Sequence, residues 1–421
     1  MTRGVARAAA ALICVVVTAI ATPAAALAAA PPKLGVTAAA LYAPATGQML
    51  DGVDANREHP IASTTKLMTA LIVLQHVRNL NTVYTYPDYH QAASDSQIGL
   101  QPGDRMTVHD LLVAMMLPSA DDAAEDLAYN VGHGSIARFV AMMNAEARKL
   151  RLTRTHYSTP IGLDTPGNYS TATDLVKLAA YDLSHSKFFA QTVDQSSAVL
   201  KTGPVRYVTN LNTLVGTVPW ITGVKTGHTN GAGYVLVASG RKDRMTLISA
   251  VLGTDSETAR SVNAMALMNY GYGNFRNWTP LRADQVVAHP TVKDRPGLHV
   301  PVHAARGFTR VLARDSHVRI RVDVPARLDG PLPRGAVVGS AKVVDNGRVI
   351  KSVAVVLLRT LPAVSGLTLA ARTVTKPLTL ALIAIVLVLL TIGLLALVAR
   401  RRGGSGPGSG GRARDSEWEV A

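Results

Sequence analysis

The stretch Pro60-Ile61-Ala62-Ser63-Thr64-Thr65-Lys66-Leu67-Met68-Thr69 decides how the rest of this 421-residue chain is interpreted. It continues into good helix formers over residues 70–74 and begins with a proline, a pattern that predicts a helix. Residues three apart on a helix share a face, so we expect the Ser63 hydroxyl beside the Lys66 amine. A serine becomes nucleophilic when a neighbouring base takes its proton, and a desolvated lysine can be that base. The pair therefore indicates acyl-transfer chemistry.

The same Ser-x-x-Lys spacing occurs twice more, from Ser184 to Lys187 and from Ser239 to Lys242. By spacing alone, each pair is most simply a solvated surface pair, because short motifs carry false positives. Partner motifs elsewhere in the chain have to decide which serine is the nucleophile.

Composition excludes several classes of function. The chain has 43 Lys+Arg against 28 Asp+Glu, a formal net charge of +15, which suits nucleic acid, an anionic membrane surface or an anionic polymer. Only 5% of residues are aromatic and no basic run is interleaved with stacking residues, so we expect no nucleic acid partner. The single cysteine, Cys14, lies in the N-terminal apolar run and would leave with it, which excludes thiol catalysis.

The sequence predicts neither a metal site nor a cofactor. Histidines are scattered without the spacing of zinc ligands, and no phosphate-cradling loop is visible. The histidines concerned are His76, His90, His109, His133 and His156.

Both ends of the chain carry membrane-related signals. Residues 1–28 combine early arginines, an apolar run and small residues, which predicts a secretory signal peptide, with an uncleaved anchor as the alternative. Residues 378–398 carry no charge and are long enough to cross a hydrocarbon core of about 30 Å. Arg400-Arg401-Arg402 follows, so the positive-inside rule places the tail, residues 399–421, in the cytoplasm. This tail is rich in Gly and Ser, and we expect it to be disordered. The chain is thus predicted to be a single-pass protein of the cell membrane with its main part outside.

Two domains are predicted between these ends. Residues 33–275 mix helical and strand patterns, which is typical of an α/β (α+β) domain. Residues 276–370 change to short strands at regular spacing, which predicts a small β-sandwich that acts as a spacer or wall-facing module. In the first domain we expect a hairpin over 35–42 and 48–53, helices over 108–116, 122–131, 136–150, 170–183 and 257–270, and strands over 210–224, 233–239 and 246–252.

Two further motifs follow Ser63 along the chain. Ser119-Ala120-Asp121 lies between two predicted helices, and Lys225-Thr226-Gly227-His228 lies on a predicted strand. Together with Ser63 and Lys66 they resemble the serine D-alanyl-D-alanine carboxypeptidases, the low-molecular-mass penicillin-binding proteins, whose motifs are S-x-x-K, S-x-N and K-T-G. The order and the separations of the three motifs fit that family.

The resemblance extends over roughly residues 35 to 360. It implies a penicillin-binding/β-lactamase-like transpeptidase domain with an antiparallel sheet flanked by helices, and no metal or organic cofactor. Further segments that look like the family are Ala45-Thr46-Gly47, Ser96 to Leu100 with Gly103-Asp104, Met142-Met143-Asn144, and Gly162-Leu163-Asp164 with Tyr169 to Ala172.

The resemblance also implies a reaction and a role for each motif. Ser63 attacks the carbonyl between two D-alanines of a peptidoglycan stem peptide, Lys66 takes its proton, and Ser119 relays a proton toward the leaving amine. Lys225 supplies positive charge for the free carboxylate of the substrate, which Thr226 also hydrogen-bonds. Water then releases the acyl group, and β-lactam antibiotics act as inhibitors.

The backbone of the third motif has an implied role as well. Gly227 lets the strand approach the nucleophile closely. By resemblance the N–H groups of Ser63 and His228 form the oxyanion hole, in which each donor is worth on the order of 3 kcal/mol.

One departure from the family lies in the second motif, where Asp121 replaces the usual asparagine in the substrate-binding set. An asparagine amide can donate as well as accept, whereas an ionised carboxylate only accepts. Beside Lys66 it would also favour the ammonium form and so raise the pKa of the proposed base. We therefore expect a working enzyme whose rate is retuned. Two decoy motifs, Lys201-Thr202-Gly203 and Ser261-Val262-Asn263, are expected to be structural.

Two alternatives stay open at this point. A class A β-lactamase shares the three motifs, but it needs a deacylating glutamate, and the turn-rich stretch before the third motif offers Asp164 and no glutamate motif. A membrane-tethered wall-binding protein, with catalysis weakened or lost through Asp121, is the alternative from another class.

Overall fold

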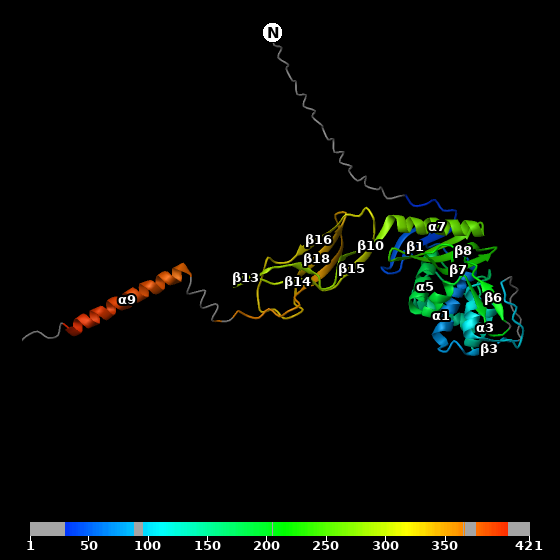
Figure 1. The fold of residues 1–421 in the computed structure, drawn as a ribbon, viewed down its shortest axis with the longest axis horizontal. Helices are drawn as coiled ribbons and strands as arrows, with labels where there is room; N and C mark the ends of the chain where they lie inside the picture. Colours follow the sequence, from blue (N-terminus) through cyan, green and yellow to red (C-terminus); the bar gives the residue numbers. More distant parts are fainter. Residues whose placement is uncertain (1–29, 88–95, 204, 365, 367–375, 403–421) are drawn as a thin grey trace, which may run out of the picture. The chain divides into compact units, whose positions relative to one another are not determined.

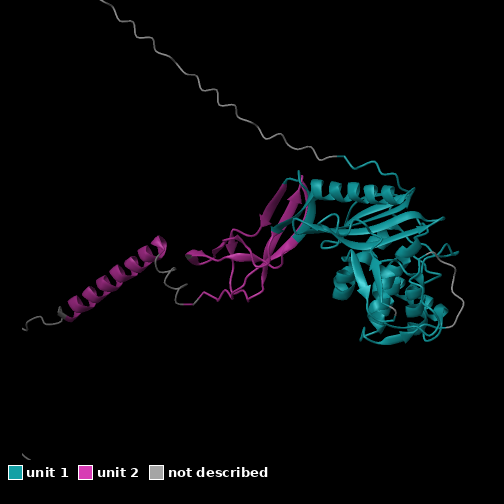
Figure 2. Ribbon diagram, turned by 45° about the vertical axis from the view of Figure 1, so that its right-hand side comes forward, with its two compact units in different colours: residues 1–280, 309–317 teal, residues 281–308, 318–421 magenta. Residues whose placement is uncertain are grey.

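The chain forms two compact units (Figure 2). Unit 1 consists of the chain up to residue 280 together with residues 309–317. Unit 2 consists of residues 281–308 and the chain from residue 318 onward. The computed structural model describes residues 30–87, 96–203, 205–364, 366 and 376–402. The predicted signal peptide, residues 1–28, and the tail beyond residue 402 lie outside the described residues.

A five-stranded antiparallel sheet forms the centre of unit 1. Its strand order is β2-β1-β9-β8-β7, so β7, which carries the third motif, lies at one edge. The predicted hairpin is confirmed, since β1 and β2 pair directly around the turn at Gly47. The strands are β1 (Ala38–Ala43), β2 (Gln48–Val53), β7 (Ile221–Thr229), β8 (Gly233–Lys242) and β9 (Met245–Thr254).

Helices cover both faces of this sheet (Figure 1). One face packs against α7 through Ala264, Leu267 and Met268. The other face packs against α5 and, beyond it, the remaining helices of the larger apolar core. Because both faces are covered, β8 and β9 are nearly continuous apolar runs rather than alternating ones.

Serine and threonine side chains begin most of these helices. Each of these N-cap side chains accepts a hydrogen bond from a backbone N–H of the first helical turn, which otherwise has no partner within the helix. The residues are Thr107, Ser135, Thr171, Ser186 and Ser256. The helices are α1 (Lys66–His76), α2 (Val108–Met116), α3 (Asp121–Val131), α4 (Ile136–Lys149), α5 (Ala172–His185), α6 (Lys187–Val193) and α7 (Glu257–Asn274).

The predicted strand over residues 210–224 is wrong in its first half. Asn210 Oδ1 accepts the N–H of Asn212 at 2.9 Å, and Asn212 Oδ1 accepts that of Leu214 at 3.3 Å. Such side-chain bonds to the backbone two residues on favour turns over strand pairing. The strand β7 therefore begins only at Ile221. Unit 1 also holds two small two-stranded sheets, β3 (Val83–Thr85) with β4 (Arg105–Thr107), and β5 (Ser197–Leu200) with β6 (Arg206–Thr209).

Unit 2 is rich in β-strands, as the sequence pattern predicts. A five-stranded sheet and a three-stranded sheet contribute to one apolar core that includes Val302, Val353 and Leu328. The larger sheet holds β11 (Val286–Ala288), β14 (Val302–Ala304), β19 (Arg348–Val356), β18 (Val337–Asp345) and β16 (Val318–Asp323). The smaller holds β13 (Arg295–His299), β12 (Thr291–Val292) and β17 (Arg327–Leu328). The remaining pair, β10 (Phe275–Leu281) with β15 (Phe308–Ala313), belongs to unit 1 except for Leu281 and Phe308.

The C-terminal helix α9 (Pro377–Arg402) is apolar along most of its length. Within Pro377–Arg401, an 18-residue stretch has a mean hydropathy of 3.2 and is not buried, so the helix is long and apolar enough to cross a membrane. The fold class expected from the sequence is confirmed: an antiparallel sheet flanked by helices, a β-rich region and one apolar C-terminal helix.

Candidate active site

Ser63 lies on a short turn that leads into α1. Residues Ala62–Thr65 form a 3-10 turn, and the α-helix begins only at Lys66, so the helix predicted from Pro60 onward starts later than expected. The reason is local, because Ala62 has a φ of 46°, which an α-helix does not allow. A non-glycine residue at positive φ stores backbone strain of about 1–3 kcal/mol, and such residues cluster at functional sites. Lys66 Nζ lies 2.9 Å from Ser63 Oγ, as the spacing predicts.

The Lys66 amine is surrounded by oxygen atoms. It donates to Ser63 Oγ, to the carbonyl of Ile161 at 2.9 Å and to Asp121 Oδ1. Burial lowers the pKa of Lys66, and the neighbouring Asp121 carboxylate acts in the opposite direction. The influence of Asp121 thus has the sign expected from the sequence, but burial outweighs it.

The second motif lies in the turn between α2 and α3. Ser119 has a φ of 68°, which again stores strain at the site. Its hydroxyl is buried and has no hydrogen-bond partner among the described residues, so it is available to a bound molecule. Asp121 is the first residue of α3, and its N–H donates to the carbonyl of Ser96 at 2.7 Å.

The third motif runs along β7. Lys225 is almost fully buried and its Nζ donates to the carbonyl of Thr226 at 3.0 Å. Burial, followed by the positive charge of Lys66, lowers the pKa of Lys225 well below its ordinary value, while Asp121 opposes the shift. The charges of Lys66, Lys225 and Asp121 are therefore coupled.

Gly227 brings β7 against the turn that carries the nucleophile. A Cβ on Gly227 would lie 2.9 Å from the backbone nitrogen of Ser63 and 2.9 Å from Ala62 Cβ, so no larger residue fits without movement. Because β7 is an edge strand, one side of its backbone faces away from β8. The β7 backbone at Gly227 thus comes close to Ser63, as an oxyanion hole built from the N–H groups of Ser63 and His228 requires.

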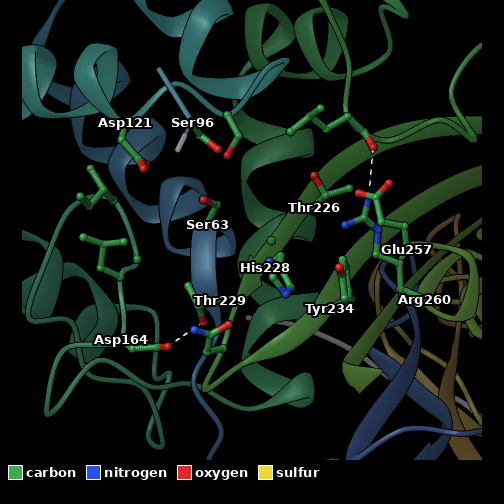
Figure 3. Close-up of a pocket in the computed structure, with 17 residues that line it drawn as sticks. Ser63, Ser96, Asp121, Asp164, Thr226, His228, Thr229, Tyr234, Glu257 and Arg260 are labelled. Carbon is green, nitrogen blue, oxygen red and sulfur yellow. Dashed lines mark hydrogen bonds and ion pairs between the residues drawn. The ribbon is translucent and has the colours of Figure 1, made fainter. Parts of the chain in front are cut away.

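These motifs meet at a cavity of about 790 Å³. In Figure 3, Asp121 and Ser96 are drawn above Ser63, with Thr226 and His228 to its right. The residues that line the cavity are Ser63, Ser96, Ser119, Asp121, Ile161, Gly162, Leu163, Asp164, Leu211, Thr226, Gly227, His228, Thr229, Asn230, Tyr234, Glu257 and Arg260.

The turn-rich stretch before α5 forms another wall. Gly162 packs so closely on the nucleophile turn that a Cβ there would lie 2.0 Å from the carbonyl oxygen of Ala62. Asp164 accepts hydrogen bonds from Thr229 Oγ1 at 2.6 Å and from the N–H of Gly231 at 2.8 Å. Asp164 therefore ties this wall to the turn between β7 and β8.

The sequence reasoning missed a group on α7 and β8. Arg260 is almost fully buried, donates to Glu257 at 3.1 Å and to the carbonyl of Leu211 at 3.3 Å, and lies over the ring of Tyr234. Tyr234 in turn stacks on His228 with ring centroids 4.0 Å apart. A signal was present, because Arg260 shares the buried face of α7 with Ala264 and the apolar residues beyond it. A cation at a core-facing helix position is unusual enough to suggest function.

The decoy motifs have ordinary structural roles. Ser184 is exposed and bonds to the carbonyl of Ala180 in its own helix, and the Ser239 hydroxyl pairs with Thr222 on the neighbouring strand. Thr202 bonds to Asp110, and Asn263 accepts the N–H of Gly35. In the part of the chain that the structure describes, no group of three His, Cys, Asp or Glu could hold a metal ion.

Comparisons with known proteins agree with this geometry. A family model described as D-alanyl-D-alanine carboxypeptidase matches residues 25–256. The D-alanyl-D-alanine carboxypeptidase of Streptomyces sp. (strain K15) is 38% identical over 245 residues, which cover 54% of this chain and 84% of that protein. The D-alanyl-D-alanine carboxypeptidase DacC of Escherichia coli (strain K12) is 30% identical over 325 residues, 73% of this chain and 79% of that protein.

Solved structures give the same result. The Streptomyces K15 DD-transpeptidase matches with a TM-score of 0.56 at 34% identity, over 58% of this chain and 100% of that one. Penicillin-binding protein 6B from Escherichia coli matches with a TM-score of 0.64 at 28% identity, over 79% of this chain and 98% of that one.

Proposed function

Because the chain belongs to the D-alanyl-D-alanine carboxypeptidase family, we propose that Ser63 is the nucleophile of this reaction and Lys66 its base. The protein is a serine-type D-Ala-D-Ala carboxypeptidase and a penicillin-binding protein. Family membership implies peptidoglycan stem peptides as substrates and β-lactams as ligands. The observation that carries the assignment of residues is the 2.9 Å contact between Lys66 Nζ and Ser63 Oγ at the cavity.

Acylation follows from this contact. Ser63 Oγ attacks the carbonyl carbon between the two D-alanines as its proton moves to Lys66 Nζ. The carbonyl oxygen becomes negative and accepts hydrogen bonds from the N–H groups of Ser63 and His228, each worth on the order of 3 kcal/mol. The close packing of Gly227 on Ser63 supports this assignment, since it holds the two backbone segments together.

Expulsion of D-alanine needs a proton on its amine and a hold on its carboxylate. Ser119 is well suited to pass that proton, because its buried hydroxyl has no competing partner among the described residues. The free carboxylate binds at Thr226 beside the positive charge of Lys225, and Arg260 supplies a further cation at the cavity wall. Water then hydrolyses the acyl-enzyme and leaves a stem peptide shortened by one D-alanine, which limits cross-linking.

The apolar helix α9 is a candidate membrane anchor. We propose that residues 1–28 are a signal peptide, that 33–275 form the catalytic domain outside the membrane, and that 276–370 form the β-rich spacer. Residues 378–398 then span the bilayer and 399–421 lie in the cytoplasm. The three arginines that end α9 support this orientation through the positive-inside rule.

Release of D-alanine by the full chain in detergent tests the proposal. Wild-type protein should convert a peptide that ends in D-Ala-D-Ala, and Ser63→Ala should lose all activity above background. Ser184→Ala, a change at an exposed serine of the same Ser-x-x-Lys spacing, is the matched control and should retain the wild-type rate. Full activity of Ser63→Ala would overturn the assignment. Rapid turnover of penicillin without D-alanine release would identify a β-lactamase instead.

A further inference from the structure

The contacts of Lys66 impose a condition on its role as a base. An ammonium has three N–H donors and no lone pair, and the three oxygen atoms around Lys66 Nζ can take all three. In that form Lys66 cannot accept the Ser63 proton. A neutral amine keeps two donors and gains a lone pair, so one proton has to leave before Ser63 can be activated.

Asp121 is the one of these acceptors that can take a proton. The carbonyl of Ile161 is a weak base, and the Ser63 hydroxyl is itself the group to be deprotonated. The Lys66 side chain is 0% exposed and that of Asp121 is 8% exposed, so water has little access to the pair. We propose that Lys66 and Asp121 hold one mobile proton between them, which passes to Asp121 Oδ1 when Ser63 is activated. This inference rests on the proposed roles of Ser63 and Lys66.

Burial favours this transfer. Two opposite charges in a site of low dielectric carry a desolvation penalty that their attraction only partly offsets. Moving the proton from Lys66 to Asp121 removes both charges and keeps a hydrogen bond between the groups. The lowered pKa of Lys66, which burial dominates, agrees with this reasoning.

Charged groups on the neighbouring elements act on the pair. From α3, Asp122 and Glu125 favour the ammonium form of Lys66. The Asp122 carboxylate is held by the N–H groups of Ile98, Gly99 and Leu100, so it is not a competing proton acceptor for Lys66.

Two cations, Lys225 and Arg260, also influence the Lys66–Asp121 pair. Lys225 on β7 interacts with both members of the pair, and Arg260 on α7 acts on Lys225. Because the positive charge of Lys66 acts on Lys225 more strongly than the charge of Asp121 does, a protonated Lys225 favours movement of the proton away from Lys66.

The step balances without an external acid or base. The Nζ–H bond to the mobile proton breaks and an O–H bond forms on Asp121, which leaves an electron pair on Nζ. Rotation about the Cε–Nζ bond turns that lone pair to Ser63. The Ser63 proton then moves to Nζ as Oγ bonds to the substrate carbonyl carbon. The site now holds a neutral Asp121, a Lys66 ammonium and the oxyanion.

The pH dependence of acylation separates this mechanism from loss of the proton to solvent. If the pair keeps one proton, the acylation rate constant does not change as the pH falls until a second proton binds to the pair. This happens at the pH at which a carboxyl group takes up a proton. If Lys66 has to lose its proton to solvent, the Asp121 carboxylate raises the pKa of Lys66 against the lowering by burial, so removing that carboxylate in Asp121→Asn moves the acid limb to lower pH. Asparagine cannot take the proton, so Asp121→Asn forces the second route.

The experiment measures the second-order rate constant for labelling of the full chain by a fluorescent penicillin in detergent between pH 5 and 10. For the wild type we expect the labelling rate constant to fall off only below about pH 6.5. For Asp121→Asn we expect this fall, the acid limb of the pH profile, at least one pH unit higher. At a pH on that limb, the variant should therefore label about tenfold more slowly than the wild type. Asp255→Asn is the matched control, because it removes an equal charge from a residue that does not contact Lys66. Its labelling rate constant should fall at the same pH as that of the wild type.

Two results would overturn the inference: a wild-type acid limb in the lysine range, or a limb that moves to lower pH in Asp121→Asn. If circular dichroism shows that the variant is unfolded, the position of the wild-type limb decides alone. Absence of labelling at every pH would instead overturn the proposed function of Ser63, so the two failures are distinguishable.

Discussion

Replacement of Gly227 by alanine tests the proposed oxyanion hole. A Cβ at this position would lie 2.9 Å from Ser63 N and from Ala62 Cβ, and 3.2 Å from the carbonyl oxygen of Ile61. Ordinary contact begins at 3.4 Å, so the two closest atoms overlap by about 0.5 Å. Most of the atoms involved are backbone, so β7 and the nucleophile turn have to separate.

The expected loss follows from that separation. Oxyanion donors act at about 2.7–3.1 Å, and removal of one costs roughly 2.7–4 kcal/mol of transition-state stabilisation. We therefore expect the acylation rate constant of Gly227→Ala to fall by on the order of 10²-fold. Overpacking should also lower the free energy of unfolding by about 1–3 kcal/mol.

The assay combines penicillin labelling rates with urea unfolding, so that a loss of rate in folded protein is separated from a loss of fold. The matched control is Gly273→Ala in α7, where an added Cβ meets nothing within 4 Å. It should label at the wild-type rate, and its free energy of unfolding should rise by up to about 1 kcal/mol, because alanine is the better helix former. A folded Gly227→Ala protein that labels within twofold of the wild-type rate would show that close packing of β7 on the Ser63 turn is not needed for acylation.

Three further predictions concern the cavity wall and the core. Arg260→Gln should raise KM for a peptide with a free C-terminal carboxylate about tenfold or more, because a charge-assisted hydrogen bond is worth about 1.5–3 kcal/mol; an unchanged KM would exclude a role in carboxylate binding. Asp164→Asn should lower the free energy of unfolding by about 1 kcal/mol, because the amide cannot accept from both Thr229 and Gly231, and unaltered stability would show that these bonds contribute nothing. Burial raises the pKa of Asp126 to about 7, so this carboxyl stabilises the fold at low pH and the contribution is lost as the pH rises through 7. Asp126→Asn should therefore be more stable relative to wild type at pH 8 than at pH 5, by about 3 kcal/mol in urea unfolding, and parallel pH profiles would contradict the shift.

Local patterns in the sequence predicted the parts of the fold that depend on local physics. The hairpin around Gly47 follows from turn chemistry, and the helix predicted over residues 170–183 is present as α5, which Thr171 caps. The Ser63–Lys66 contact follows from helical spacing.

Features that depend on distant packing were not predictable in this way. The strain at Ala62 exists because Gly162 and Gly227 pack against its turn from two distant segments. Arg260 reaches the cavity only because α7 crosses the sheet beside β8. Asp121 raises the pKa of Lys66, as its charge predicts, but the burial that outweighs this effect is a property of the folded core.

Localisation of the penicillin adduct tests the central claim most directly. After labelling, trypsin should release a peptide spanning residues 58–66, and fragmentation in the mass spectrometer assigns the added mass to one side chain. We expect a single covalent adduct on Ser63, absent in Ser63→Ala and strongly slowed in Lys66→Ala. An adduct on Ser119 or another residue, or none at all under conditions in which the protein is folded, would contradict it.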